Sequence, residues 1–140
     1  MNTMLERILI VDDEPDMCWV LEHILEKCGR RSAKAFSGKE ALACLANGGF
    51  RLVFLDAKLP DLDGLEVARR MHKMEPLLPI VMVSGYFYRN DESVQRALAE
   101  GLLSGFVAKP FLHEEILKAV EIGFAGPVGK SFHGSDGKIP

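Results

Sequence analysis

The hydrophobic positions of the chain fall into short apolar runs separated by longer stretches with helical spacing. Five such runs cover residues 7–11, 32–36, 52–55, 80–83 and 105–108, and the second of them, SAKAF, carries the weakest signal. The others are continuously apolar rather than alternating apolar with polar, as strands covered on both faces are. The pattern therefore predicts an α/β protein with a parallel sheet and helices on both faces.

The stretches after these runs carry helix signals. Pro15 suits the first turn of a helix that Gly29 ends. Residues 37–40, SGKE, form a capping box. Asp63 stands where it can cap a third helix, and a fourth is expected at about 91–100. The apolar positions expected on the buried helix faces are Val20, Leu21, Ile24, Leu25, Cys28, Ala41, Leu42, Leu45, Leu65, Val67, Ala68, Met71 or His72, Ile116, Ala119, Val120, Gly123 and Phe124.

Composition narrows the class of protein. A chain of 140 residues with 48% hydrophobic and 26% charged residues is typical of one soluble domain. A net charge of −3 without a dense basic block argues against direct contact with nucleic acid. The three cysteines show no CxxC spacing, which favours reduced thiols.

The ends of the chain carry no targeting signal that we recognise. Residues 1–6 lack the apolar core of a signal peptide, and no apolar run is long enough to span a membrane. We therefore expect a cytoplasmic protein. Residues 126–140 are rich in glycine and proline and have no periodicity. We expect a flexible tail or the start of a linker there, which leaves 1–125 as the domain.

Polar residues stand directly after the apolar runs. Asp12 and Asp13 follow the first run, Asp56 the third, Ser84 the fourth and Lys109 the fifth. Each has an ordinary interpretation alone: an aspartate pair caps a helix, a serine before glycine makes a turn, and a lysine before proline lies in solvent. No ordinary interpretation of this kind fits Asp56 well, because the apolar run before it places its charge near the core. If the strands are neighbours, all five side chains meet at one edge of the sheet.

Such a cluster suggests phosphoryl transfer. Carboxylates held close together repel one another and raise the proton affinity of at least one of them, which a bound cation relieves. Oxygen ligands with some retained water suit Mg²⁺. An aspartate beside Mg²⁺ can attack phosphorus, with a lysine ammonium and a serine hydroxyl facing the phosphoryl oxygens. We therefore expect Asp56 to be the residue that becomes phosphorylated.

The stretches ILIVDDEPD, VFLDAKLPDLDG, PIVMVSG and GFVAKPF together resemble the receiver domain of two-component response regulators. The resemblance covers about residues 7–124. It implies a flavodoxin-like (βα)5 doubly wound fold with a five-stranded parallel sheet of order 2-1-3-4-5. It also implies that Asp56 accepts phosphate from the phosphohistidine of a sensor histidine kinase or a phosphotransfer protein.

The resemblance implies a metal site as well. Asp12, Asp13 and Asp56 would hold Mg²⁺, Asp13 directly and Asp12 at least through water, and Lys58 would contribute its backbone carbonyl. Mn²⁺ can substitute for Mg²⁺. Pro60 and Gly64 match the loop that follows the phosphorylation site in the family.

Further roles follow from the same resemblance. Ser84 and Lys109 would contact the phosphoryl group, and the Lys109–Pro110 peptide bond would be cis. Ser84 would move towards the phosphoryl group, and Phe106 would then rotate inward as the aromatic switch. That movement would reshape the face made by helix four, strand five and helix five, as a population shift between two packings.

Two departures from the family pattern stand out. The interval from Ser84 to Lys109 is longer than usual, and the extra length falls at 86–91 and 101–105, on either side of helix four. The partners of that face are therefore left open. Lys58 and Tyr86 stand where they could tune the lifetime of the acyl phosphate, while Tyr86 is equally well explained as a surface aromatic.

Three other functions are weighed against the receiver. A phosphohydrolase of the haloacid dehalogenase type would carry a second aspartate two residues after Asp56, where this chain has Lys58. A flavodoxin-like cofactor binder would need a phosphate cradle rich in glycine or in serine and threonine after the first strand, where Asp12 and Asp13 would repel a phosphate without a metal. A docking module that is never phosphorylated would not need every one of these positions. We expect no enzyme beyond self-phosphorylation and slow self-dephosphorylation, an unidentified downstream effector, and no membrane partner; homodimerisation stays open.

Overall fold

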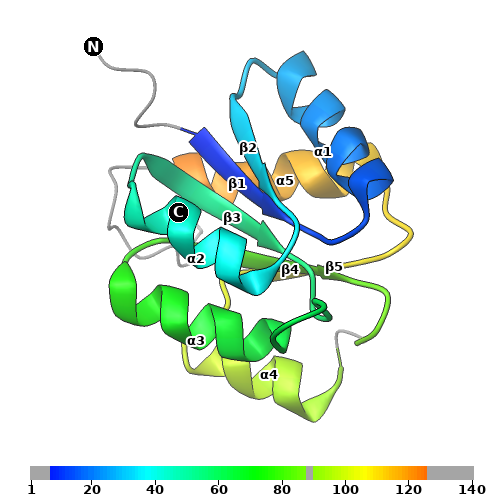
Figure 1. Ribbon diagram of the computed structural model, residues 1–140. Coiled ribbons are helices and arrows are strands. Elements are labelled where there is room, and N and C mark those ends of the chain that lie inside the picture. The colour runs from blue at the N-terminus through cyan, green and yellow to red at the C-terminus, as the bar shows by residue number, and fades with distance from the viewer. Residues whose placement is uncertain (1–6, 88–89, 126–140) are drawn as a thin grey trace.

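The computed structural model describes residues 7–87 and 90–125. Over these residues the chain forms five strands that alternate with five helices (Figure 1). The strands are β1 (Arg7–Val11), β2 (Ser32–Ala35), β3 (Phe50–Leu55), β4 (Ile80–Ser84) and β5 (Gly105–Ala108). The helices are α1 (Pro15–Lys27), α2 (Gly38–Ala46), α3 (Gly64–Met74), α4 (Glu92–Ala99) and α5 (His113–Phe124).

The sheet confirms the expected topology. Its strands are hydrogen-bonded in the order β2-β1-β3-β4-β5, and each neighbouring pair is parallel. The chain crosses from one side of β1 to the other between β2 and β3, so the crevice outside the carboxyl ends of β1 and β3 is the switch point where such sheets bind ligands. This is the edge on which Asp12 and Asp56 stand.

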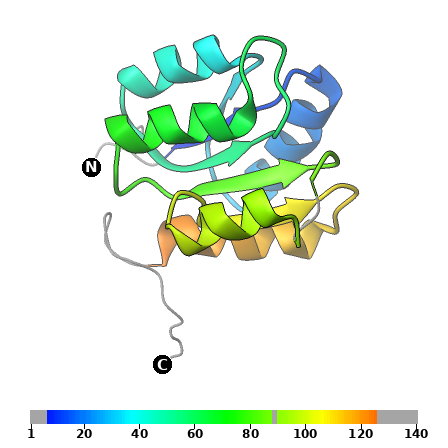
Figure 2. The ribbon, with the colours of Figure 1, turned by 90° about the horizontal axis from the view of Figure 1, so that it is seen from below.

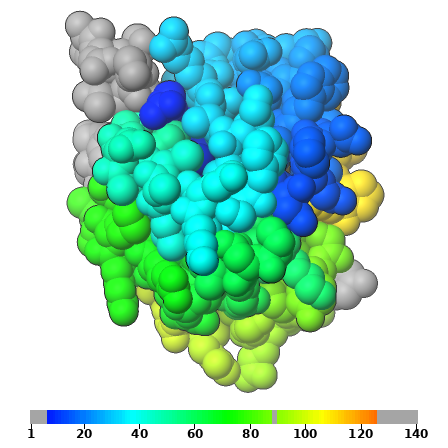
Figure 3. All heavy atoms as spheres, in the orientation of Figure 1, coloured from blue at the N-terminus to red at the C-terminus, as the bar shows by residue number. Residues whose placement is uncertain are grey.

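Side chains that alternate along each strand divide the core into two layers. Ile8 and Ile10 pack with buried residues of α1 and α5, whereas Leu9 and Val11 pack with those of α2, α3 and α4. Figure 2 shows α2 and α3 on one side of the sheet and α5 on the other. Figure 3 shows α2 lying against α3 on the outer surface. Both faces of the strands are thus buried, which explains their continuous apolar sequence.

Some local expectations need correction. β2 ends at Ala35, and β3 begins at Phe50, two residues before the expected start. The Ser37 hydroxyl accepts a hydrogen bond from the Glu40 N–H at 3.1 Å, as the capping box predicts. Asp63 does occupy the N-cap position of α3, but its side chain makes no capping hydrogen bond among the described residues. Its backbone instead pairs with that of Lys58, which closes the loop before α3.

The expected tail or linker at 126–140 and the amino-terminal residues 1–6 lie outside the described residues. So do residues 88 and 89, within the longer interval before α4. In the part of the chain that is described, no helix is both long and apolar enough to cross a membrane.

Candidate functional site

The parallel register places the polar strand ends side by side. Asp12 and Asp56 each follow the last residue of the paired strands β1 and β3, and the Asp56 N–H donates to the Val11 carbonyl at 2.9 Å. Ser84 ends β4, and the N–H of Lys109, which follows β5, donates to the Ser84 carbonyl at 2.9 Å. The five strand-end residues of the sequence analysis therefore lie at one edge of the sheet.

Three carboxylates of this edge are close neighbours. Asp12, Asp13 and Asp56 each offer an oxygen within 4.8 Å of the other two. The Asp12 side chain is 3% exposed and that of Asp56 is 12% exposed, whereas Asp13 is exposed. Two nearly buried negative charges therefore need a partner, and one open carboxylate faces solvent beside them.

Lys109, the residue after β5, brings a positive charge to these carboxylates. Its Nζ lies 2.9 Å from Asp12 Oδ2, 3.7 Å from Asp56 Oδ1 and 3.8 Å from Glu14 Oε1. Burial by itself lowers the pKa of Lys109, but the hydrogen bond and charge of Asp12, with the charges of Asp56 and Glu14, raise it above the usual value. The amine therefore stays protonated.

The carboxyl group of Asp56 binds its proton more tightly than an ordinary aspartate does. Burial is the largest cause, followed by the charge of Asp12, and together they raise the pKa of Asp56 from 3.8 to about 6. Lys109 and the Ala57 N–H oppose this rise, and Asp13 adds to it. One ammonium group does not neutralise the cluster, so a further cation, or loss of the charge on Asp56, stabilises the site.

This imbalance predicts a pH effect on the metal-free protein. A carboxyl whose pKa is higher in the folded than in the unfolded state stabilises the fold most below its unfolded pKa, and that stability is lost as pH rises through the folded pKa. For Asp56 the loss falls between about pH 4 and pH 6. Asp56→Asn, which cannot ionise, is expected to raise the free energy of unfolding at pH 7 by about 1–3 kcal/mol relative to the wild type, and by much less at pH 4.

Urea unfolding in EDTA at a series of pH values measures this difference. Glu121→Gln is the control, because it neutralises an exposed carboxylate on α5 that is not part of the cluster. If Asp56→Asn raises the free energy of unfolding equally at all pH values, or lowers it at pH 7, the raised pKa assigned to Asp56 is contradicted.

The donor set suits magnesium. Mg²⁺ prefers carboxylate and carbonyl oxygens and retains several waters. The gathered oxygens of Asp12, Asp13 and Asp56 meet the first preference, and the exposure of Asp13 leaves room for the waters. These three carboxylates therefore fit Mg²⁺.

Ser84 is fully buried, and its hydroxyl serves the turn after β4. Its Oγ accepts hydrogen bonds from the N–H groups of Tyr86 at 2.8 Å and Phe87 at 3.1 Å. The hydroxyl proton is still available for donation. The Lys58 ammonium lies 4.7 Å from the centre of the Tyr86 ring, and the Tyr86 and Phe87 rings meet edge to face. Lys58 and Tyr86 therefore form one cation–π pair beside the aspartate cluster.

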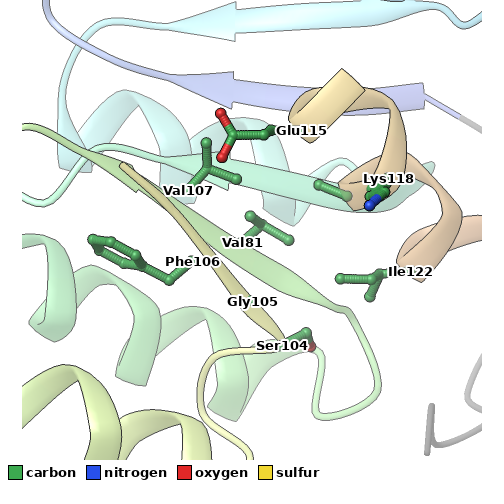
Figure 4. Close-up of a pocket in the computed structure, with 9 residues that line it drawn as sticks. Val81, Ser104, Gly105, Phe106, Val107, Glu115, Lys118 and Ile122 are labelled. Carbon is green, nitrogen blue, oxygen red and sulfur yellow. The ribbon is translucent and has the colours of Figure 1, made fainter. Parts of the chain in front are cut away.

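Phe106 does not stand in the outward position from which the implied rotation starts. The ring is 2% exposed and belongs to the apolar layer under α2, α3 and α4. Figure 4 shows it turned away from Val81 and Ile122, which line a pocket between β5 and α5. Phenylalanine has no hydroxyl that must reach water, so burying it without a phosphoryl group leaves no polar atom unpaired.

The loop between Asp56 and α3 has a tight base. A Cβ on Gly64 would lie 2.5 Å from the Asp56 carbonyl oxygen and 2.6 Å from that of Ala57, so no larger residue fits without moving the backbone. The Gly64 N–H donates to the Ala57 carbonyl at 2.8 Å. On the other side of the site, the Lys109–Pro110 peptide bond is cis.

Several contacts of the site were not foreseen from the sequence. Glu14 approaches Lys109, and its N–H donates to Asp12 Oδ1 at 3.0 Å. The Cys18 thiol donates to the Asp12 carbonyl at 3.3 Å, and burial followed by the Asp12 charge raises the pKa of Cys18 to about 11, so it stays a thiol. Asp61 binds the start of α2 through both carboxylate oxygens. Glu14 is the N-cap residue of α1, and Cys18 lies only six positions from Asp12, whereas the contact of Asp61 joins segments that are far apart in the sequence.

Comparisons with known proteins agree with this geometry. A profile of the response regulator receiver domain matches residues 8–121. The chain is 33% identical over 118 residues to sporulation initiation phosphotransferase F of Bacillus subtilis, covering 84% of this chain and 93% of that protein. It is 35% identical over 113 residues to the uncharacterized transcriptional regulatory protein YkoG of Bacillus subtilis, covering 81% of this chain but only 48% of that protein.

A solved structure shows the same fold. The response regulator TrrA of Thermotoga maritima, solved in complex with Mg²⁺ and BeF, superposes with a TM-score of 0.74 at 30% identity, covering 84% of this chain and 98% of that one. The chain therefore belongs to the response regulator receiver domain family of two-component systems, with the flavodoxin-like fold of that family.

Proposed function

We propose that Asp56 is the phosphoacceptor of this receiver domain and takes its phosphoryl group from the phosphohistidine of a sensor histidine kinase or phosphotransfer protein. The observation that supports this most is the state of Asp56: a nearly buried carboxylate of raised pKa, between Asp12 and the Lys109 ammonium, at the sheet edge where this family acts.

The transfer follows from the positions of the chain's own groups. A carboxylate oxygen of Asp56 attacks phosphorus as the N–P bond of the phosphohistidine breaks. The electron pair of that bond returns to the imidazole nitrogen, and a ring that is protonated on its other nitrogen leaves as neutral histidine, with the aspartyl phosphate as the second product. Lys109, 3.7 Å from Asp56, stands ready to neutralise a phosphoryl oxygen once it leaves Asp12. Ser84 can donate its hydroxyl proton to another.

We propose that Asp12, Asp13, Asp56 and the Lys58 backbone carbonyl hold Mg²⁺ during this reaction. The cation, when bound, neutralises charge on the phosphoryl oxygens. The carboxylates of Asp12 and Asp13 keep the ion beside Asp56, and the exposure of Asp13 keeps the site open to the phosphodonor.

Phosphorylation is proposed to act on the loop before α4 through Ser84. Movement of the Ser84 hydroxyl towards the phosphoryl group breaks its hydrogen bonds with the N–H groups of Tyr86 and Phe87. The Phe87 side chain packs against the apolar layer that contains Phe106, so its release perturbs that layer under α4. Phe106 then acts as a packed element of the switch rather than as a ring that moves inward from solvent.

The lifetime of the aspartyl phosphate is proposed to depend on Lys58 and Tyr86, whose cation–π pair stands beside the site. Lys58 occupies the place where an aspartate-based phosphohydrolase needs its general acid. An ammonium held over an aromatic ring is a poor proton donor to a leaving group, which favours slow hydrolysis and signalling.

The organisation and partners of the whole protein are proposals too. We propose that residues 1–125 form the receiver and 126–140 a tail or linker, and that the domain acts in the cytoplasm on an unidentified effector without touching nucleic acid itself. Several relatives, such as YkoG, are about twice the length matched here, which fits a receiver joined to further sequence in those proteins. Dimerisation through the α4–β5–α5 face is the alternative output.

Incubation with acetyl phosphate and Mg²⁺ tests the function. The expected result is a stable mass increase of one phosphoryl group that EDTA prevents and Asp56→Asn abolishes. Rapid release of inorganic phosphate without an adduct points to a phosphohydrolase instead. Neither adduct nor release points to a docking module and contradicts the proposal. Asp91→Asn serves as the control, because Asp91 lies at the start of α4, outside the cluster.

A further inference from the structure

The tip of the loop that follows Asp56 is hydrogen-bonded to the start of α2. Asp61 Oδ1 accepts a hydrogen bond from the Gly38 N–H at 2.8 Å, and Asp61 Oδ2 accepts one from the Lys39 N–H at 2.9 Å. These are the first two residues of α2. Asp61 and α2 are far apart in the sequence, so the contact exists only in the fold.

Side-chain packing fixes the same point. A Cβ on Gly38 would lie 2.9 Å from Leu62 Cδ1 and 2.9 Å from a methyl group of Val67. The first turn of α2 therefore rests directly on Leu62, the residue after Asp61, and a larger residue at position 38 would have to displace the side chains of Leu62 and Val67. A polar and an apolar contact thus hold two successive residues of the loop tip against α2.

The base of the loop is fixed independently. The backbone of Gly64 lies so close to the carbonyl groups of Asp56 and Ala57 that a side chain at Gly64 would clash with them. The backbones of Lys58 and Asp63 pair across the loop. The loop that carries the Lys58 carbonyl is therefore held at both its base and its tip. That carbonyl is the backbone group proposed above as a metal ligand.

We propose that Asp61 is a positioning residue of the phosphoacceptor site, which holds the Lys58 carbonyl in the place that Mg²⁺ binding needs by binding the start of α2. The inference rests on the proposed function of Asp56. It goes beyond it by assigning to an exposed carboxylate outside the metal cluster a part in the affinity of that cluster for its cation.

A cap of α2 that has no connection with the loop supplies the matched control. The Ser37 hydroxyl accepts from the Glu40 N–H in the same helical turn that Asp61 binds. Ser37→Ala and Asp61→Ala therefore both remove capping acceptors from α2, but only the second frees the loop tip. Asp61→Asn keeps one carbonyl acceptor and gives an intermediate variant that also serves if Asp61→Ala fails to fold.

The test measures Mg²⁺ dissociation constants by calorimetry, phosphorylation rates with acetyl phosphate, and thermal stability for the wild type and the three variants. Asp61→Ala is expected to weaken Mg²⁺ binding about tenfold, the lower end of the cost of losing a group that orients metal ligands, and to slow phosphorylation. Asp61→Asn is expected to fall between it and the wild type. Ser37→Ala is expected to lower thermal stability and leave the dissociation constant unchanged within error.

Equal effects of Asp61→Ala and Ser37→Ala on Mg²⁺ affinity, or none from either, overturn the inference and leave Asp61 as a helix cap, while the proposed function stands. A wild-type chain that binds no Mg²⁺ and forms no adduct overturns the proposed function, and the inference with it.

Discussion

Lys109→Met is expected to slow the phosphorylation of Asp56 by acetyl phosphate about a hundredfold, since one charged donor to the developing phosphoryl charge is lost. Methionine keeps an unbranched side chain that is one atom shorter and removes its charge. In the metal-free protein the same change leaves Asp12, with its side chain 3% exposed, and Asp56, with 12%, without their nearest cation. Breaking a buried ion pair is costly, so the free energy of unfolding at pH 7 should fall by about 2–4 kcal/mol.

Magnesium is expected to restore most of that stability but not the rate. The cation replaces Lys109 as the counter-charge of the aspartates, whereas the phosphoryl oxygen that Lys109 faces stays without a donor. Lys118→Met, on the exposed side of α5, is the matched control and should change neither quantity. Unfolding by urea with and without Mg²⁺, together with the rate of adduct formation, measures both. A variant that is phosphorylated as fast as the wild type contradicts the role given to the amine.

Gly64→Ala is expected to damage the site through the backbone alone. The added methyl group meets the carbonyl oxygens of Asp56 at 2.5 Å and Ala57 at 2.6 Å, and backbone atoms cannot turn aside as a flexible side chain can. The strand end that carries the phosphoacceptor must therefore move. Overpacking of this kind costs about 1–3 kcal/mol of stability, and the displacement of Asp56 should lower both Mg²⁺ affinity and the rate of phosphorylation.

A second glycine beside the site gives the comparison. A Cβ on Gly85 lies 3.7 Å from the nearest atom of Lys109, an ordinary contact, so Gly85→Ala should keep Mg²⁺ affinity and fold stability close to the wild type. Calorimetric Mg²⁺ titration and urea unfolding of Gly64→Ala and Gly85→Ala measure the difference in Mg²⁺ affinity and in stability between the two variants. If both behave alike, the close approach at Gly64 has no consequence for the site.

The order and type of the elements follow from the sequence because the strands are buried on both faces. Runs such as LVFL before Asp56 have no polar position, which is typical only of strands between two helical layers. The clustering of the site residues could then be predicted as well, since the carboxyl ends of parallel strands share one edge of the sheet. The order of the strands came from the family resemblance, because periodicity does not tell over which face each helix crosses.

What the sequence did not predict depends on contacts between distant segments. The carboxylate of Asp61 binds α2 across 23 positions of the chain. The side chain of Asp63 makes no capping hydrogen bond with α3 among the described residues, and the backbone of Asp63 pairs with that of Lys58. Phe106 lies inside the core, packed with residues of α2, α3 and α4, most of which are distant in the sequence. A pattern of apolar and polar letters contains none of these distances.

The position of the modification decides between this assignment and its rivals. The chain is phosphorylated with acetyl phosphate and Mg²⁺, the acyl phosphate is reduced with borohydride, and the peptides are mapped by mass spectrometry. The expected result is a single reduced residue at Asp56, absent when EDTA is present during phosphorylation. A phosphoryl group on another residue, or a modification at Asp56 that forms equally well without a divalent cation, contradicts a metal-dependent phosphoacceptor at the switch point of this sheet.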